Sequence, residues 1–575
     1  MNIGMILAAV TVLTGSDASR SQLTAAEELR EYCGKMGIES GTIELRTDES
    51  LGENGYVLSS EDGKVVICGS KARGVLNGAY GYLQDKCGVE WFSSWCEQVP
   101  KREALPQLAA PETHRPAFEV RCSFWQDIMM HPRLGARLRM NSNIWYPRDD
   151  KFGPNCHKVD PLFEFSHSVR RILPVEKYFK DHPEWYSMGE DGKRHGVPNH
   201  FSELCYSNLR MRDEFYANLV KYIEQDRAKN PTSYPAIYDM TQMDNCNYLC
   251  LCPECKKVIA KYNRTPDGHA EGGDQGLQLE FVNRLARKIR ERYPDVKIRT
   301  FAYVSTEEPP KEGTIRPEPN VVIWWCDVYS YSDHTLPLAT AGHYNQKQAD
   351  EIDGWLKLTK NVQIWDYMLY HNSFPEVSPD AIAADAKFFA DRGLPAMFME
   401  TEYHNQPFYL LNSFLMSELY INPDLNVDKL IRKCCRVYGA AAPEMEEAIR
   451  FLRTIERDEH AKTEGDWHNR LLPWLSRANM EKLAAMLQAA YDKPGLTKAE
   501  SARIAEPLAA TWKKLVMVLK QDPRAADAYA HAQQEWVRYA KQVARDGFME
   551  PSRREKAAAQ IDEELELLTL TFRDL

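Results

Sequence analysis

The sequence predicts an α/β fold in which a (β/α)8 TIM barrel lies between a small N-terminal α/β domain and a C-terminal all-helical domain. Two patterns lead to this prediction. Through the middle of the chain, short β-rich runs alternate with helical stretches, and beyond that middle only helical periodicity remains. We therefore expect an N-terminal domain over 1–110, a barrel over 111–421 and a helical domain over 422–575.

The composition is that of an ordinary globular protein. The chain has 575 residues, of which 43% are hydrophobic and 27% charged, and these values exclude a disordered chain, a collagen and a coiled coil. Its 72 Lys and Arg against 83 Asp and Glu give a net charge of −11, which argues against a dedicated nucleic-acid-binding protein. No apolar run has the length of a transmembrane helix, so no membrane span is expected. No pattern in the sequence predicts an oligomeric state.

The first 13 residues are apolar and allow two interpretations. A secretory signal peptide is also apolar, but this stretch has no Lys or Arg before its apolar part and no clear small-residue cleavage site. We therefore expect a strand, a turn at 15–17 and a helix from Ser21, with a degenerate signal peptide as the alternative; the location of the protein stays open. Further elements of this domain are strands at 56–59, 64–69 and 89–92 and a helix at 73–87 that ends at Gly88.

The barrel prediction depends on eight β-rich runs with helices between several of them. A doubly wound sheet would carry a glycine-rich phosphate loop after its first strand, and the sequence has none. The expected strands are 118–125, 143–146, 203–206, 236–240, 297–303, 321–327, 362–367 and 396–400. The clearest helices between them are 277–292 and 382–392, and those of the C-terminal domain are 427–438, 442–459, 480–491, 499–519, 524–544 and 553–571.

Carboxylate and aromatic side chains gather where the later strands end, and the chemistry of a barrel takes place at those carboxyl ends. Carboxylates protonate a leaving oxygen and stabilise an oxocarbenium-like centre, and aromatic faces hold a pyranose ring, so the pattern indicates a sugar-processing cleft. For any single residue, a helix N-cap or a solvated side chain is the alternative. The residues are Asp239, Gln242, Asp244 and Asn245, then Tyr303, then Trp324, Trp325 and Asp327, then Trp365, Asp366 and Tyr367, and finally Glu400, Glu402 and Tyr403.

Two carboxylates are the predicted catalytic residues. Asp244 lies in the loop after the fourth strand, among polar neighbours. Glu400 ends a strongly apolar strand, where an unpaired carboxylate would be costly without a purpose; a structural ion pair is the alternative. Glu402 has the same side-chain parity as Glu400 if the strand continues, so one of the two can support the other.

Further residues are predicted to bind the substrate. His167 can contact a sugar hydroxyl, or it can be a buried histidine with its hydrogen bonds satisfied. Tyr303 and Trp325 can stack on a sugar, or they can be core residues. Arg121, in the first strand, can meet a carboxylate of the protein or of the substrate. The complete predicted set is Asn245, Gln242, Asp366, His167, Tyr303, Trp325, Glu402 and Arg121.

The 14 cysteines are scattered except for one cluster, at Cys246, Cys250, Cys252 and Cys255. A disulfide framework would be denser and in a shorter chain. The C-x-C-x-x-C run has zinc-knuckle spacing for three thiolates, but no fourth ligand is visible nearby. A tight turn with buried or paired thiols is therefore favoured over a structural metal, and we expect no metal or other cofactor.

Several motifs resemble known glycosidases. The segments at 73–83, 88–92 and 99–100 resemble the domain that precedes the barrel in α-glucuronidases and β-hexosaminidases. A second set resembles a large bacterial family of formerly unknown function that includes glycoside hydrolase family 163, and the likeness covers residues 1 to about 455. This set consists of His-Pro-Glu-Trp-Tyr at 182–186, Gln-Met-Asp-Asn at 242–245, the cysteine run at 250–255, Ile-Trp-Asp at 364–366 and 438–443.

This resemblance implies a glycoside hydrolase that cleaves a β-linked N-acetylglucosamine-containing glycan, as an endo-acting enzyme on N-glycans with substrate-assisted retention. In the related enzymes, two adjacent acidic residues after the fourth strand orient the substrate acetamide and act as general acid. The corresponding pair here is Asp244 and Asn245, and an amide cannot donate a proton as a carboxylic acid does. Asp244 is then the acid itself, or the acid is Glu400 or Glu402. An α-glucuronidase with Arg121 or Arg210 facing its cleft, and a glycan-binding protein on a decayed barrel, are the alternatives.

Overall fold

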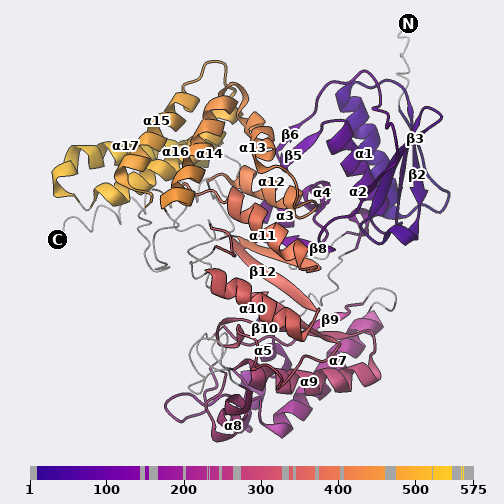
Figure 1. Cartoon of the computed structure of the whole chain (residues 1–575), viewed down its shortest axis with the longest axis vertical. Helices are drawn as coiled ribbons and strands as arrows, with labels where there is room; N and C mark the ends of the chain where they lie inside the picture. Colours follow the sequence, from indigo (N-terminus) through magenta and orange to yellow (C-terminus); the bar gives the residue numbers. More distant parts are fainter. Residues whose placement is uncertain are drawn as a thin grey trace.

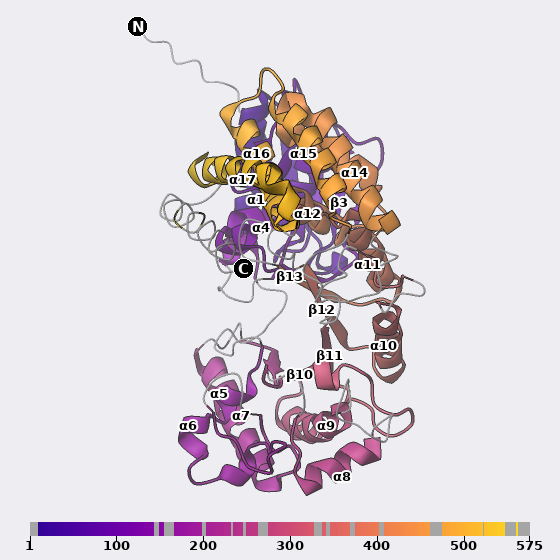
Figure 2. The same ribbon diagram turned by 90° about the vertical axis from the view of Figure 1, so that its left-hand side faces the viewer.

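The computed structural model divides into an N-terminal α/β part, a central sheet with its helices and a C-terminal group of helices (Figure 1). In both views the N-terminal part and the C-terminal helices lie at one end of the molecule and helices α7 to α9 at the other (Figures 1 and 2). The structure describes residues 10–142, 149–154, 166–197, 203–229, 231, 234–244, 249–262, 274–326, 336–340, 345–368, 374–401, 407–459, 474–520, 522–546, 559 and 561.

The N-terminal part is a five-stranded sheet covered by two helices. Helix α1 (Arg20–Met36) begins with a reciprocal capping box between Ser19 and Gln22 and ends at Gly37, whose φ of 87° suits a residue without a Cβ. Helix α2 (Gly74–Gly81) continues as a π-turn through Lys86, so the expected helix at 73–87 is confirmed. The strand order is β1 (Thr11–Leu13), β2 (Thr42–Thr47), β4 (Lys64–Gly69), β3 (Tyr56–Glu61) and β7 (Glu112–His114), and β5 (Glu90–Ser93) pairs with β6 (Cys96–Gln98).

The centre of the molecule is a curled sheet of six parallel strands. Its order is β8 (Val120–Ser123), β13 (Ala396–Thr401), β12 (Val362–Met368), β11 (Val321–Cys326), β10 (Lys297–Ala302) and β9 (Ile237–Asp239). Each of these strands matches one of the eight predicted runs, and only β12 and β13 extend past theirs, by one residue each. Helices alternate with the strands along the chain, namely α7 (Leu209–Lys229), α8 (Pro253–Tyr262), α9 (Gln275–Arg292), α10 (Asn345–Leu358), α11 (Pro379–Asp391) and α12 (Tyr409–Leu419). The described sheet is therefore a half-barrel of the predicted class.

The other two predicted strands are not part of this sheet in the described chain. The run at 143–146 lies outside the described residues. The run at 203–206 is wrong as a barrel strand, because Leu204 forms an isolated antiparallel bridge with Tyr186. The backbone amide of Cys205 donates to the carbonyl of Trp185 at 2.8 Å, which fixes this segment beside 185–187. The described residues therefore do not form a closed eight-stranded barrel.

Strand alternation sorts the side chains of the sheet into two layers. One face carries an aromatic cluster that includes Phe301, Trp324, Trp365 and Phe398. The other face carries apolar residues that join the main core beneath the helices. On the aromatic face, Arg299 forms a fully buried ion pair with Asp239, at 2.5 and 2.9 Å, and its guanidinium carbon lies 3.4 Å from the centroid of the Trp324 ring. This face is the inside of the half-barrel.

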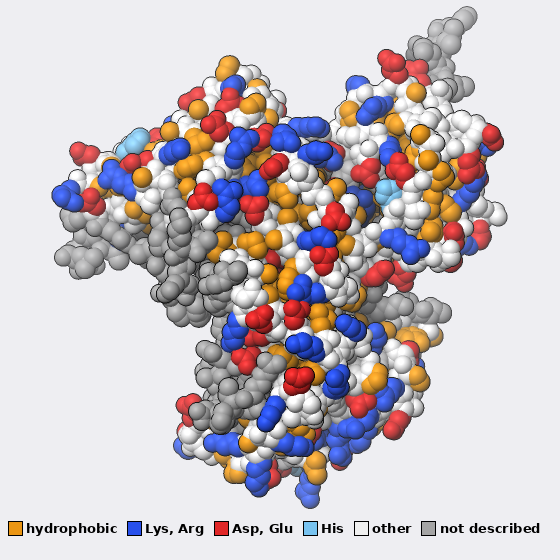
Figure 3. Space-filling view, viewed as in Figure 1, with side chains coloured by type: hydrophobic (Ala, Val, Ile, Leu, Met, Phe, Trp, Pro, Cys, Tyr) orange, Lys and Arg blue, Asp and Glu red, His pale blue; other side chains and the backbone are white. Residues whose placement is uncertain are grey.

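Five helices of the expected C-terminal domain are described, and the predicted run at 553–571 falls on residues of which nearly all lie outside the described chain. Helix α16 packs against both α15 and α17 and begins with a capping box between Thr497 and Glu500. No helix in the described ranges is long and apolar enough to cross a membrane. On the face shown in Figure 3, Lys and Arg are interspersed with Asp and Glu. The helices are α13 (Val427–Cys435), α14 (Ala442–Glu459), α15 (Arg477–Tyr491), α16 (Lys498–Leu519) and α17 (Ala526–Asp546).

Candidate active site

Glu400 lies near the carboxyl end of β13 and has the same strand parity as Phe398 of the aromatic cluster. The indole Nε1 of Trp365, on the neighbouring strand β12, donates a hydrogen bond to Glu400 Oε2 at 2.8 Å. Burial raises the pKa of Glu400 to about 7; the indole hydrogen bond lowers it, and the negative charge of Asp244 raises it. The carboxyl group therefore holds its proton for about half of the time at neutral pH.

Asp244 follows β9 and is exposed, so that it presents a carboxylate to solvent above the sheet. The hydroxyl of Tyr303, at the end of β10, donates to Asp244 Oδ1 at 2.9 Å. This contact fixes one carboxylate oxygen and leaves Oδ2 for another donor. Because the charge of Asp244 raises the pKa of Glu400, the two acids are close enough to interact electrostatically.

Gln242 lies beneath Asp244 and is fully buried. Its side-chain Nε2 donates to the carbonyl of Tyr303 at 3.0 Å, and its Oε1 accepts from Thr306 Oγ1 at 2.7 Å and Gln278 Nε2 at 2.9 Å. An amide oxygen with two donors is saturated. Gln242 is therefore a positioning residue that joins the ends of β9 and β10, and its oxygen has no lone pair left for a substrate.

The backbone on both sides of this network adopts left-handed conformations. Val304, directly after Tyr303, has φ of 49°, and His167 has φ of 52°. Such values are uncommon for residues other than glycine, above all for a β-branched one, and they cluster at functional sites. His167 Nδ1 lies 2.8 Å from the carbonyl of Gln242 and must donate to it, so Nε2 is the acceptor in the neutral ring. The imidazole rests edge-on against Phe301, with ring centroids 5.6 Å apart.

Tightly packed aromatic rings form the floor under these groups. The centroid of Trp365 lies 4.7 Å from that of Trp324, 4.8 Å from that of Phe398 and 5.5 Å from that of Phe301. Trp365 and Tyr303 are exposed by only 6% and 9%, so only their edges reach the surface of the floor. The floor excludes water from Glu400, and this desolvation is the cause of its raised pKa.

The arrangement provides a pair of acids in two different environments. A half-buried carboxyl with a pKa near neutrality can donate a proton, and an exposed carboxylate can stabilise positive charge or hold a donor group. Within the described ranges, the one cluster of His, Cys, Asp or Glu with the spacing of metal ligands is a group of four cysteines that includes neither acid. Proton transfer between carboxyl groups and a substrate oxygen is the chemistry that the site supports.

The structure brings Asp244, Gln242, Tyr303, His167 and Glu400 near one another; their roles in binding or catalysis stay predictions. It does not bring Trp325 or Asp366 to them, because both lie on the opposite face of their strands. Trp325 is fully buried in the core under the helices. Asp366 faces α11. Burial raises the pKa of Asp385 on that helix, and the negative charge of Asp366 raises it further. Asn245 and Glu402 lie outside the described residues.

Arg121 is also turned away from the half-barrel. Its guanidinium donates to the carbonyl of Arg139, with Nε at 2.9 Å and Nη2 at 2.7 Å, and Nη1 donates to the carbonyl of Phe118 at 2.5 Å. These contacts hold it at the junction with the N-terminal part. Arg210, the other arginine considered for a uronate, is exposed in the first turn of α7.

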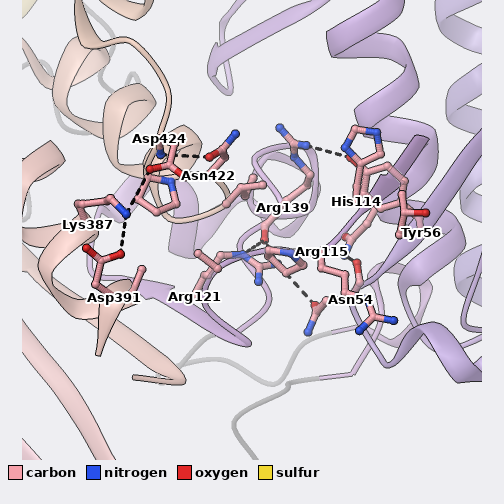
Figure 4. Close-up of a pocket in the computed structure, with 17 residues that line it drawn as sticks. Asn54, Tyr56, His114, Arg115, Arg121, Arg139, Lys387, Asp391, Asn422 and Asp424 are labelled. Atoms are coloured by element: carbon pink, nitrogen blue, oxygen red, sulfur yellow. Dashed lines mark hydrogen bonds and ion pairs between the residues drawn. The ribbon is translucent and has the colours of Figure 1, made fainter. Parts of the chain in front are cut away.

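The junction beside Arg121 contains a cavity of about 450 Å³ (Figure 4). It lies at the amino ends of β8 and β13, whereas barrel chemistry takes place at the carboxyl ends. Among its ionic groups, Lys387 Nζ contacts Asp391 at 2.5 Å and Asp424 at 3.3 Å, and Arg139 pairs with Glu418 at 3.3 Å. This cavity is therefore a feature of the interface between the N-terminal part and the sheet.

The sequence placed Trp324 and Trp365 at the strand ends but left both out of the predicted binding set, which named Trp325 and Asp366 instead. Strand alternation was the available signal. Arg299 and Phe301 alternate along β10, and Tyr303 continues this alternation directly after it, so their side chains lie on one face of the sheet. Phe301 pairs with Trp324 in the register of β10 and β11, which places Trp324, and not Trp325, on that inner face. The same rule on β12 selects Trp365 over Asp366.

Residues 91–449 match a protein family, DUF4838, which is described as a domain of unknown function. The chain belongs to this family. The matched range contains all six strands of the DUF4838 half-barrel, with Asp244 and Glu400. No curated protein matches the chain in sequence. The family therefore supplies no activity by itself.

Solved structures that share the fold of this DUF4838 chain include glycoside hydrolases. The family 89 glycoside hydrolase from Clostridium perfringens in complex with PUGNAc has a TM-score of 0.53 at 12% identity. A variant of that enzyme in complex with its substrate GlcNAc-alpha-1,4-galactose gives 0.55 at 12%, and the complex with 2-acetamido-1,2-dideoxynojirmycin gives 0.53 at 13%. Each comparison covers 92% of this chain and 66% of the other, so the chain spans about two thirds of the length of these hydrolases.

Proposed function

We propose that the protein is a glycoside hydrolase that cleaves a glycan containing N-acetylglucosamine. The observation that carries this proposal is Glu400, a half-buried carboxyl with a pKa near 7 at the carboxyl end of a parallel strand, close enough to the exposed carboxylate of Asp244 for that charge to raise its pKa. Glycosidases typically use two carboxyl groups that flank the scissile bond. The glycosidase fold of the structural neighbours supports the same class of reaction.

In the proposed reaction, Glu400 is the general acid. It donates its proton to the glycosidic oxygen while the bond from that oxygen to the anomeric carbon breaks. For a β-linked substrate, the carbonyl oxygen of the substrate's own acetamide attacks the anomeric carbon, and Asp244 Oδ2 accepts the acetamide N–H. Water then attacks the anomeric carbon while the bond from the acetamide oxygen to that carbon breaks, and the water gives its proton to Glu400, which restores the acid.

The finer assignment is an endo-β-N-acetylglucosaminidase that acts on N-glycans. Its support is the resemblance of segments 182–186, 242–245 and 250–255 to the family that includes glycoside hydrolase family 163. An asparagine at position 245 is consistent with this assignment when Glu400 is the acid, because residue 245 is then not required to give a proton.

A second candidate is hydrolysis of an α-linked N-acetylglucosaminide, since the neighbouring family 89 enzyme is in complex with GlcNAc-alpha-1,4-galactose. In an α-linked substrate the acetamide lies on the same side as the leaving group and cannot attack, so Asp244 would have to be the nucleophile. An α-glucuronidase is disfavoured because the guanidinium of Arg121 is bound to backbone carbonyls at the junction.

The test is incubation of the purified protein with four substrates: N-glycoproteins, aryl β-N-acetylglucosaminides, aryl α-N-acetylglucosaminides and glucuronoxylan oligosaccharides. Products are read by mass spectrometry. Intact glycans released from N-glycoproteins support the endo-β assignment, and cleavage of the α-aryl substrate supports the second candidate. Glucuronic acid as the product, or binding without any product, contradicts the proposal.

A further inference from the structure

Four cysteine side chains converge beside the loop that carries Asp244. Cys250 and Cys252 precede α8, Cys255 lies in its first turn, and Cys205 comes from the segment before α7. All four are buried, and their Sγ atoms lie within 4.8 Å of one another. Cys205 is thus the fourth member that the spacing of the C-x-C-x-x-C run could not reveal.

The separations of the sulfur atoms fit a tetrahedral metal site. Cys205 Sγ lies 3.6 Å from Cys252 Sγ and 3.8 Å from Cys255 Sγ. A zinc–sulfur bond of about 2.3 Å in a tetrahedron places neighbouring sulfurs about 3.8 Å apart. A disulfide would need about 2.05 Å, and all four cysteines are free.

The surroundings of the cluster supply hydrogen-bond donors for negatively charged sulfur. The backbone amide of Met188 donates to Cys250 Sγ at 3.3 Å, and the amide of Cys255 donates to Cys252 Sγ at 3.5 Å. Arg194 Nη1 also lies 3.6 Å from Cys250 Sγ. Four thiolates around a divalent cation carry a net charge of two minus, which a guanidinium and N–H donors compensate; four neutral thiols would need neither.

We propose that Cys205, Cys250, Cys252 and Cys255 bind one zinc ion as a closed, structural tetrathiolate site. Four protein ligands complete the tetrahedron and leave no position for a substrate or a water molecule, so the ion takes no part in the reaction. Thiolate ligands favour zinc over magnesium, calcium and manganese, which prefer oxygen.

The ion fastens the segment around Cys205 to the loop between β9 and α8. Next to Cys205, the carboxyl of Glu203 accepts from the amide of Met243 at 2.6 Å, one residue before Asp244. Leu249 lies further along the same loop, and its backbone amide donates to Asp274 Oδ2 at 2.7 Å. The zinc site thus holds the same two segments together that position Asp244, and this positioning role rests on the proposed function.

The experiment measures metal content in protein that is expressed with added zinc and purified under reducing conditions. We expect about one zinc per chain by inductively coupled plasma mass spectrometry, released when a mercurial reagent titrates the four thiols. Cobalt exchanged into the site should give the visible bands of tetrahedral cobalt and thiolate-to-cobalt charge transfer. Wild-type protein that holds no zinc after reconstitution, or that contains a disulfide among these residues, overturns the proposal.

Variants assign the ligands. Cys205→Ser and Cys252→Ser should lose the stoichiometric zinc, whereas Cys68→Ser, in the N-terminal sheet, and Cys246→Ser should keep it. Loss of zinc in the Cys246→Ser protein, or its retention in Cys205→Ser, contradicts the ligand set. Metal content is read independently of turnover, so a zinc-loaded protein without glycosidase activity would refute the proposed function and leave the zinc site standing.

Discussion

Glu400 combines three influences that set the behaviour of a general acid. Removal from water by the aromatic floor favours its neutral form, the charge of Asp244 acts in the same direction, and the indole of Trp365 opposes both. The balance places its pKa at about 7, where a carboxyl group is poised to give and to take back a proton.

This balance predicts the alkaline limb of the pH profile. Glu400 must be protonated to act, so its contribution is complete well below pH 7 and is lost as the pH rises through 7. We expect kcat/KM on the identified glycan to fall about tenfold per pH unit above this value. A profile that stays flat from pH 6 to pH 9 contradicts the assignment of Glu400 as the acid.

Trp365→Phe tests the role of the indole donor. The hydrogen bond from Nε1 stabilises the charged carboxylate, so its removal should raise the pKa of Glu400 and move the alkaline limb to higher pH. Trp324→Phe is the matched control, since it removes a neighbouring indole and leaves the Trp365 contact in place. An alkaline limb that moves to lower pH in Trp365→Phe shows that the bond has a different role.

At the scale of single residues, the sequence singled out both Asp244 and Glu400. For Glu400 the reason was that a carboxylate after an apolar strand is costly without a purpose. The hydrogen bond from Tyr303 to Asp244 also joins two residues that the sequence singled out. The sequence could not show that Glu400 is paired with an indole, because the partner depends on the register between β12 and β13.

Strands explain why some predicted residues fall outside the site. Adjacent residues of a strand place their side chains on opposite faces of the sheet. Choosing between Trp324 and Trp325 therefore requires knowing which residues of the neighbouring strands share the inner face. Asp366 is polar and ends a strand, as a site residue would, but it belongs to the layer between β12 and α11. Pattern alone identified the strands and left the inward face undecided.

The ion pair of Arg299 and Asp239 inside the half-barrel gives a prediction about stability. Arg299→Met should lower the free energy of unfolding by about 3–5 kcal/mol, because it leaves Asp239 charged, buried and without its guanidinium. Arg299→Met combined with Asp239→Leu should recover most of that loss. Urea unfolding followed by tryptophan fluorescence measures both, and a double variant no more stable than Arg299→Met alone contradicts the account.

On the scale of the whole molecule, composition and periodicity predicted the class of fold and the helical C-terminal region. They could not distinguish the segment around Glu203 from a barrel strand, because its pairing with 185–187 and its bond to Met243 are long-range contacts. Cys205 was missed for the same reason: a ligand 47 residues before Cys252 has no local signature.

Several buried acids predict an unusual dependence of stability on pH. The pKa values of Glu90, Glu203 and Asp274 are each raised to about 7, first of all by burial. Their neutral forms stabilise the fold below the unfolded pKa of about 4, and this contribution is lost as the pH rises to 7. We expect the thermal midpoint to fall between pH 5 and pH 8, with a smaller change in Glu203→Gln. A midpoint that rises over this range contradicts the burial of these groups in neutral form.

The most direct test of the central claim compares Glu400→Gln with the wild type on two substrates that differ only in the leaving group. A natural sugar leaving group needs a proton, whereas dinitrophenolate leaves without one. If Glu400 is the general acid, Glu400→Gln should lower kcat/KM at least about a hundredfold on the natural glycan. On the dinitrophenyl glycoside of the same glycan, the loss should be less than about tenfold. Equal losses on both substrates, or no loss on either, would show that Glu400 is not the acid.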